Sequence, residues 1–164
     1  MIPNVKFFLK GNGGPLIKTS RDIFDNKRVV LFSLPGAFTP ICSTKMLPAY
    51  EDNYMEFREL GIDEVYCIAV NDVFVMEAWK EDLIIQNVKM LPDGNGDFTK
   101  GMGMLVAKTN LGYGNRSWRY AAVINGGEIE WEGVEPGQRS NTDKDPYENS
   151  RPERVLEYLK KVAK

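Results

Sequence analysis

The chain of 164 residues has 21 basic and 23 acidic side chains, which is long enough for one domain with a sizeable core, so we expect a single domain spanning residues 1–164. A net charge of −2 without a basic block argues against nucleic acid as a partner. No apolar run is long enough to span a membrane and the first residues lack the apolar core of a secretory signal, so we expect a cytoplasmic protein that binds no membrane.

The amino-terminal part is predicted to form two short strands around the turn at residues 11–15, followed by a short helix at residues 20–24. Residues 28–34 form an apolar, β-branched run that predicts a buried strand. The apolar period that follows predicts a helix over residues 43–60. Pro48 has no N–H group to donate, so we expect it to kink this helix.

Cys42 is placed by this pattern in the first turn of a helix that begins where a buried strand ends. Small ligands meet α/β folds at this edge of the sheet. The unpaired N–H groups and the partial positive charge of a first helical turn favour the thiolate form of a cysteine. The alternative is an inert buried thiol, which is the usual fate of a free cysteine.

The absence of histidine narrows the chemistry that Cys42 can perform. It excludes Ser-His-Asp and Cys-His hydrolases, HExxH metalloproteases and most catalytic zinc sites, and we expect no metal and no cofactor. Activation of the thiol must then come from backbone dipoles, hydroxyl groups and arginine. Such a thiolate suits a soft electrophile with a good leaving group, such as a peroxide or a disulfide. It suits acyl transfer poorly, because a leaving amine needs a proton from a general acid.

Residues 64–70 predict a second buried strand, which would pair parallel with the first through a right-handed crossover. Asn71 and Asp72 are expected to cap the next helix, and residues 88–91 to form a third short strand. The apolar residues of that helix that we expect to face inward are Phe74, Met76, Trp79 and Leu83.

The segment from Asp93 to Asp97 resembles the opening of a calcium-binding loop. A calcium loop requires glycine at its sixth position and glutamate at its twelfth, whereas this chain has Phe98 and Met104 there. We therefore expect a turn that leads into a short helix at residues 98–104.

The last part of the chain is predicted to contain a hairpin, formed by residues 119–124 and 128–131. Residues 133–149 are polar and without a periodic pattern, and this is longer than most connections. A capping box from Ser150 to Glu153 predicts the start of a final helix. Its expected inward residues are Val155, Leu156, Leu159 and Val162.

This order of elements predicts an α/β protein with a thioredoxin-like fold, in which helices flank a central mixed β-sheet that has an amino-terminal extension. The Cys-x-x-Cys sequence of redox-active thioredoxins is missing. Thr39-Pro40-Ile41-Cys42 takes its place.

At these residues the chain resembles the peroxiredoxins, in particular their type-5 and plant type-II branch. Residues 35–43 match the active-site motif Pro-x-x-x-Thr-x-x-Cys of that family, and residues 70–79, 93–99 and 116–120 are similar to further motifs of the branch. The resemblance spans nearly the whole chain. It is strongest to the peroxiredoxin half of bacterial proteins that have a fused glutaredoxin.

The resemblance implies a thiol-dependent peroxidase that reduces hydrogen peroxide and organic hydroperoxides and works as a homodimer. Cys42 would be the peroxidatic cysteine, oxidised to a sulfenic acid. Thr39 would hydrogen-bond the peroxide and the thiolate, Arg119 would supply positive charge, and Pro35 would shield the sulfur from water. An arginine entering a strand is, taken alone, more often part of a surface ion pair.

The reductant is less clearly implied, because many members of the branch have histidine four residues after the cysteine and this chain has Met46. We expect Cys67, within a buried strand, not to resolve Cys42, which predicts a one-cysteine cycle with glutathione and glutaredoxin. The alternatives are a Cys42–Cys67 two-cysteine cycle with thioredoxin, a glutathione-dependent transferase or disulfide reductase, and a redox-sensing interaction protein.

Overall fold

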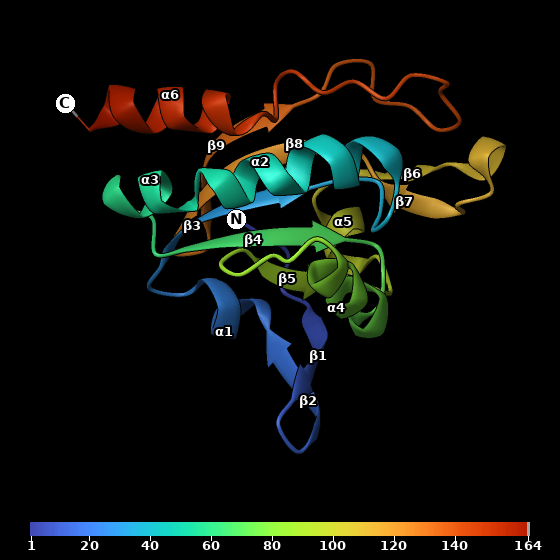
Figure 1. The fold of residues 1–164 in the computed structure, drawn as a ribbon, viewed down its shortest axis with the longest axis horizontal. Helices are drawn as coiled ribbons and strands as arrows, with labels where there is room; N and C mark the ends of the chain where they lie inside the picture. The colour runs from blue at the N-terminus through green and yellow to red at the C-terminus, as the bar shows by residue number, and fades with distance from the viewer. Residues whose placement is uncertain (164) are drawn as a thin grey trace.

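The apolar run that begins at Arg28 forms the middle strand of the central sheet in the computed structural model, which describes residues 1–163. This sheet has five strands in the order β5-β4-β3-β8-β9, and Figure 1 shows them stacked across the molecule. The three parallel strands are β3 (Arg28–Ser33), β4 (Glu64–Ala69) and β5 (Lys89–Pro92). The antiparallel hairpin of β8 (Tyr120–Asn125) and β9 (Glu128–Val134) completes the sheet along the other edge of β3. The predicted thioredoxin-like α/β architecture is confirmed.

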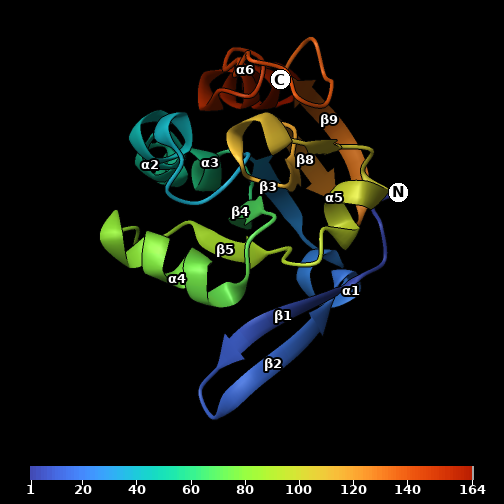
Figure 2. The ribbon, with the colours of Figure 1, turned by 90° about the vertical axis from the view of Figure 1, so that its right-hand side faces the viewer.

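Helices cover both faces of this sheet. Figure 2 shows α2, α3 and α4 on one side of the strands and α1 and α5 on the other. The helical segments are α1 (Ser20–Phe24), η1 (Cys42–Met46), α2 (Leu47–Asp52), α3 (Tyr54–Glu59), α4 (Val73–Asp82), α5 (Asp97–Gly101), η2 (Thr109–Leu111) and α6 (Pro152–Val162). Two short strands, β6 (Leu105–Ala107) and β7 (Asn115–Ser117), pair on either side of η2. None of the helices within residues 1–163 is long and apolar enough to cross a lipid bilayer.

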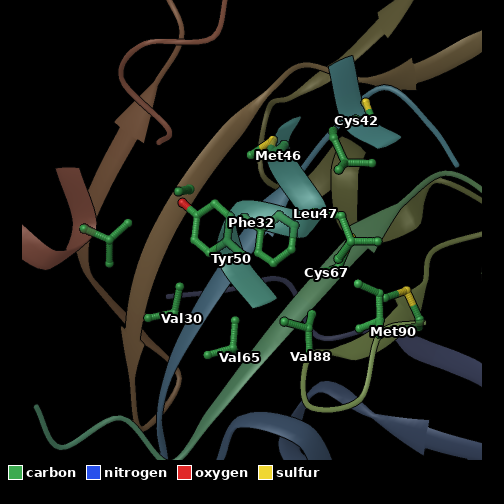
Figure 3. Packing of buried hydrophobic residues seen from close by; sticks show 14 of the residues in the cluster. Val30, Phe32, Cys42, Met46, Leu47, Tyr50, Val65, Cys67, Val88 and Met90 are labelled. Atoms are coloured by element: carbon green, nitrogen blue, oxygen red, sulfur yellow. The ribbon is translucent and has the colours of Figure 1, made fainter. Parts of the chain in front are cut away.

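The alternation of side chains along β3 divides the core into two layers. Val30 and Phe32 face the layer under α2, whereas Val29 and Leu31 face the opposite layer. Tyr50 of α2 stacks on Phe32 with ring centroids 4.0 Å apart, and Figure 3 shows this pair at the centre of the first layer. Burial of each such side chain stabilises the fold by roughly 1.5–3 kcal/mol.

The amino-terminal extension is an antiparallel hairpin of β1 (Lys6–Gly11) and β2 (Gly14–Thr19), which projects from the body of the molecule in Figure 1. Phe7 anchors the hairpin, because its ring lies 5.7 Å from that of Phe98 in the second core layer. The predicted turn and the short helix that follows it are both confirmed.

The helix α4 begins as predicted, since the Asp72 carboxylate accepts a hydrogen bond from the Val75 N–H group. Met76 and Trp79 are fully buried, but Phe74 is 72 % exposed, so its expected inward position is wrong. Residues two apart on an α-helix lie about 200° apart around its axis, so Phe74 cannot share the face of Met76.

The acidic segment that begins at Asp93 is explained without a cation. The Asp93 carboxylate accepts hydrogen bonds from the N–H groups of Phe98 and Thr99 and from the Thr99 hydroxyl. Asp93 thus satisfies the first turn of α5, which starts at Asp97 rather than at Phe98.

The final helix differs from its predicted form at both ends. It begins at Pro152 with Arg151 in the capping position, and no side chain makes a capping hydrogen bond, so the predicted Ser150–Glu153 capping box is wrong. Val155, Leu156 and Leu159 are buried as expected, whereas Val162 is 47 % exposed in the last turn.

Candidate active site

Cys42 lies in the first turn of a helix that starts a few residues after the end of β3. Helical backbone begins at Pro40, and the Thr39 carbonyl accepts the Ser43 N–H at 3.0 Å, which makes Thr39 the first hydrogen-bonded residue of the helix. The Cys42 side chain is only 1 % exposed. The predicted position of this thiol at the positive end of a helix is confirmed.

The helix around Cys42 is a π-helix from Cys42 to Met46, which sequence reasoning did not predict. The Leu47 N–H bonds the Cys42 carbonyl, five residues back, so the first turns are wider than in an α-helix. Pro48 stands at the start of the following α-helix, where its missing N–H group is tolerated. The expected kink at Pro48 is thus replaced by a π-turn before it and a break at Asn53.

Arg119 directs its guanidinium group at the thiol. Its Nη1 donates to the Cys42 Sγ at 3.5 Å and to the Met46 Sδ at 3.3 Å, and Figure 3 shows these two sulfur atoms on consecutive turns of one helix. Arg119 immediately precedes β8 and is 1 % exposed, so the alternative of a surface arginine is wrong. Burial lowers its pKa, but the charges of Cys42 and Asp145 outweigh burial and hold the pKa of Arg119 above its ordinary value. The guanidinium group therefore stays charged beside the thiol.

A loop without helix or strand, residues 135–151, holds Arg119 from the other side. The Arg119 Nη2 pairs with the Asp145 carboxylate at 2.6 Å, and its Nε donates to the Pro146 carbonyl at 3.1 Å. Sequence reasoning missed both residues, because nothing local marks two positions that bind an arginine 26 and 27 residues earlier. The signal present in the sequence was the unusual length of the polar stretch, since long unstructured loops in compact domains are often functional.

The loop is anchored by Glu135, which is 1 % exposed. Its carboxylate accepts hydrogen bonds from the Ser150 hydroxyl at 2.6 Å, from the Ser150 N–H at 2.7 Å and from the Glu148 N–H. These bonds explain why Ser150 does not cap α6. The Ser150 hydroxyl is already committed to a buried carboxylate, and a charged acceptor is the stronger partner.

The segment between β3 and Cys42 is fixed by three further contacts. The Thr39 hydroxyl donates to the Gly36 carbonyl at 2.6 Å, and the Asn71 side chain accepts the Ala37 N–H at 2.9 Å. Arg116 donates to the Pro35 carbonyl at 3.2 Å and lies so close to Gly36 that a Cβ atom there would collide with it. Asn71 therefore holds the active-site segment, while Asp72 alone caps α4.

A pocket of about 70 Å³ opens beside this segment. One wall consists of Pro35, Thr39 and Pro40, and Lys108, Leu111 and Tyr113 form another. The remaining lining residues come from the loop that holds Arg119 and are Thr142, Asp143, Lys144 and Asp145. Of the predicted site residues, Arg119 thus contacts the sulfur directly, whereas Thr39 and Pro35 line the adjacent pocket.

Cys67 lies on β4 in the same core layer as Cys42 and has no exposed surface (Figure 3). Both cysteines are free thiols. Burial, and to a smaller extent the charge of Cys42, raises the pKa of the Cys67 thiol well above its ordinary value. Cys67 is therefore a weak nucleophile, because a thiol must ionise to attack.

The arrangement suits nucleophilic attack by sulfur on a small, soft electrophile. A helix terminus and a guanidinium group provide positive charge at the thiol, which is itself buried. Within residues 1–163, no three Asp, Glu or Cys side chains come together in a way that could bind a metal ion.

The comparisons with known proteins agree with this chemistry. The sequence pattern of the Redoxin family matches residues 1–149. The chain is 58 % identical over 146 residues to a peroxiredoxin of Rhizobium etli, covering 89 % of this chain and 82 % of that protein. It is 45 % identical over 158 residues to the hybrid peroxiredoxin hyPrx5 of Haemophilus influenzae, covering 96 % of this chain and 64 % of that protein. The solved structure of the antioxidant protein of Plasmodium falciparum, described as a 1-Cys peroxiredoxin, is similar with a TM-score of 0.94, 37 % identity and 98 % coverage of both chains.

Proposed function

The chain belongs to the redoxin family and, within it, to the peroxiredoxins of the type-5 and plant type-II branch, and on this premise we propose how its site works. It is a peroxidase that uses peroxides as substrates and thiols as reductants. We propose that Cys42 is the peroxidatic residue. The observation that supports this assignment best is the 3.5 Å contact between its Sγ and the charged Nη1 of Arg119.

In the oxidative step the Cys42 thiolate attacks one oxygen of the peroxide. The S–O bond forms as the O–O bond breaks, the sulfur becomes a sulfenic acid, and the leaving oxygen takes up a proton as water or alcohol. The Thr39 hydroxyl already donates its proton to Gly36, so its oxygen is left to accept the O–H of the peroxide. Arg119 stabilises the thiolate and the negative charge that moves onto the oxygens, and Pro35 keeps water from the sulfur.

We propose that the sulfenic acid is reduced by an outside thiol in a one-cysteine cycle, with glutathione and glutaredoxin as the reductants. The complete burial and raised pKa of Cys67 support this, because they make Cys67 slow to attack the oxidised Cys42. The hybrid name of the Haemophilus relative and the 1-Cys description of the Plasmodium protein point the same way. Such a cycle needs a reducing thiol pool, and we place the enzyme in the cytoplasm for that reason.

The test compares two coupled assays with hydrogen peroxide, one with glutathione and glutaredoxin and one with thioredoxin. We expect turnover in the first and none in the Cys42→Ser variant. Mass spectrometry after one equivalent of peroxide should show Cys42 as a sulfenic acid or its glutathione disulfide. An intramolecular Cys42–Cys67 bond, or lost turnover in Cys67→Ser, would establish the two-cysteine cycle with thioredoxin instead.

The same measurements address the other hypotheses. A transferase or disulfide reductase would need a second electrophile before it consumed thiol, whereas the proposed enzyme needs peroxide alone. A redox-sensing protein without turnover would oxidise at Cys42 no faster than free cysteine does.

We also propose that the enzyme is a homodimer, formed through the loops at the end of the sheet where Cys42 lies. The support is a set of exposed apolar side chains on segments at that end, Phe38, Phe74 and Leu111, which are 52 %, 72 % and 54 % exposed. Large exposed apolar side chains that gather at one end of a molecule are typical of an interaction surface.

A further inference from the structure

Lys108 is a buried cation without a charged partner. It follows β6 at the base of the loop that contains η2, and it is only 4 % exposed. Among residues 1–163, no ion pair and no side-chain hydrogen bond involves its ammonium group. The Trp118 ring, with its centroid 5.8 Å from Nζ, offers a cation–π contact but no acceptor for the three N–H donors of the ammonium group.

The Lys108 side chain lines the 70 Å³ pocket that Pro35, Thr39 and Pro40 also line. The pocket also contains Lys144, Asp143 and Asp145. Asp145 is already neutralised by Arg119, and Asp143 makes no ion pair with Lys108. The Lys108 ammonium group thus places in a small pocket a positive charge that has no ion-pair partner within residues 1–163, and this charge favours an anionic ligand.

We propose that the Lys108 ammonium group binds the carboxylate of the small molecule that reacts at Cys42, either the reducing thiol or the hydroperoxide. The pocket has room for two or three water molecules at roughly 30 Å³ each, which fits a carboxylate and the first carbon atoms of its chain. Its other walls, with Thr39 on one side and Asp145 on the other, belong to the two segments that position the thiol and Arg119. A molecule held by its carboxylate at Lys108 would therefore have its remaining atoms beside Thr39 and Asp145, the pocket residues of these two segments.

The thiol form of this inference rests on the proposed function, since glutathione is a thiol that bears carboxylates. The experiment separates the two steps by stopped-flow tryptophan fluorescence and measures each with a matched pair of reactants. Reduction of the sulfenic acid is followed with mercaptoacetate and with 2-mercaptoethanol, and oxidation with a hydroperoxy fatty acid and with its methyl ester. The quantity of interest is the ratio of the rate constant for the acid to that for its neutral counterpart.

In the Lys108→Met variant, we expect this ratio to fall about tenfold for the reactant that binds at Lys108. Lys108→Arg, which keeps the charge, should restore most of it. Lys144→Met removes the same charge from an exposed position of the same pocket, and its ratio should change by less than about twofold. A fall in the thiol pair identifies the reductant as the ligand, and a fall in the peroxide pair identifies the substrate.

An unchanged ratio in both pairs, or an equal loss for acid and neutral reactants, would overturn the proposal. If Lys108→Met does not fold, the unmodified protein still decides, because propionate should compete with the carboxylate reactant while propionamide should not. Equal competition by propionate and propionamide would also overturn the proposal. Neither reactant pair contains glutathione or glutaredoxin. The test of Lys108 therefore gives the same answer even if glutathione and glutaredoxin prove not to be the reductants.

Discussion

Arg119 is the residue on which the two halves of the site depend. One of its nitrogens faces the sulfur atoms of Cys42 and Met46, and the other two bind the loop at Asp145 and Pro146. The planar guanidinium group can satisfy all of these partners at once, which a lysine ammonium group could not do with the same geometry. Met46 adds a second soft acceptor for Nη1 at 3.3 Å.

Replacing Arg119 by methionine should lower kcat/KM for hydrogen peroxide by about 100-fold to 1,000-fold, because a charged donor to the reacting atoms is lost. Methionine is a similarly long, unbranched side chain, so the circular dichroism spectrum of the variant should match that of the unmodified protein. Thr39→Val, which removes only the hydroxyl, should also lose most activity. If either variant retained full kcat/KM, the role proposed for that residue would be wrong.

The Asp145→Asn substitution should lower kcat/KM for hydrogen peroxide by about fivefold, because a weaker hydrogen bond replaces the ion pair that orients Arg119. Asp143→Asn is the matched control, because Asp143 lines the same pocket but is not among the hydrogen-bond or ion-pair partners of Arg119. Equal effects of the two substitutions would show that general charge, and not the position of Arg119, is responsible.

Among the residues of the site, the sequence predicted Cys42 and Arg119 but not the loop residues that bind Arg119. Cys42 was found from the local pattern, because a buried apolar strand followed by the apolar period of a helix is a local feature. Arg119 was found through family resemblance. Asp145 and Pro146 were not found, because their contacts depend on how the long loop returns to the sheet.

Among the elements, the loop of residues 135–151 has the largest effect on the site although it contains no helix or strand. Glu135 anchors it through the Ser150 hydroxyl and the N–H groups of Ser150 and Glu148, and the Glu135 carbonyl also accepts the Trp118 indole N–H at 2.7 Å. One buried carboxylate thus ties the end of the loop at Glu148 and Ser150 back to its start at Glu135.

Glu135→Gln should lower the free energy of unfolding by about 2–4 kcal/mol, because the amide presents N–H donors to groups that are themselves donors. Urea unfolding measures this directly. Glu132→Gln, an exposed glutamate on the same hairpin, should change the free energy by less than about 0.5 kcal/mol. A loss below about 1 kcal/mol in Glu135→Gln would contradict the anchoring role of Glu135.

The elements that the sequence predicted well are those fixed by their own periodicity. The strands at Arg28 and Glu64 are apolar on both faces, which is a property of the segments themselves. The errors arose where a tertiary partner decided the outcome. Ser150 prefers the Glu135 carboxylate to the helix end, and the π-helix at Cys42 depends on backbone bonds that no composition signals.

At the scale of the whole molecule, the exposed apolar side chains near the active-site end predict dimerisation. Phe74→Lys should convert the protein to a monomer at micromolar concentration in sedimentation velocity, because a charged side chain would have to be buried in the interface. Phe74 is 72 % exposed, so the fold should persist. Met55→Lys on α3, a similarly exposed position at the opposite end of the molecule in Figure 1, should leave the dimer intact. A monomeric unmodified protein would contradict the homodimer.

The tyrosines predict how stability changes at alkaline pH. Burial raises the pKa of Tyr66 to about 12 and that of Tyr147 to about 12, whereas an unfolded tyrosine ionises near pH 10. Each of these tyrosines therefore loses its proton first in the unfolded chain, so its contribution to the free energy of unfolding is constant well below pH 10 and falls as the pH rises toward 12. Urea unfolding at several pH values should show this decline, and Tyr66→Phe should make it shallower. A free energy of unfolding independent of pH in this window would contradict the effect of burial.

The distance in sequence between the thiol and its supporting residues sets the order in which the site matures during synthesis. Arg119 is made 77 residues after Cys42, and Asp145 another 26 residues later. Synthesis proceeds at about 5–20 residues per second. For roughly 5–20 s the nascent chain therefore contains Cys42 but not yet both Arg119 and Asp145. Under the proposed mechanism, the Cys42 thiol therefore lacks its contact with Arg119 until the carboxyl-terminal part of the chain has been made and has folded onto the sheet.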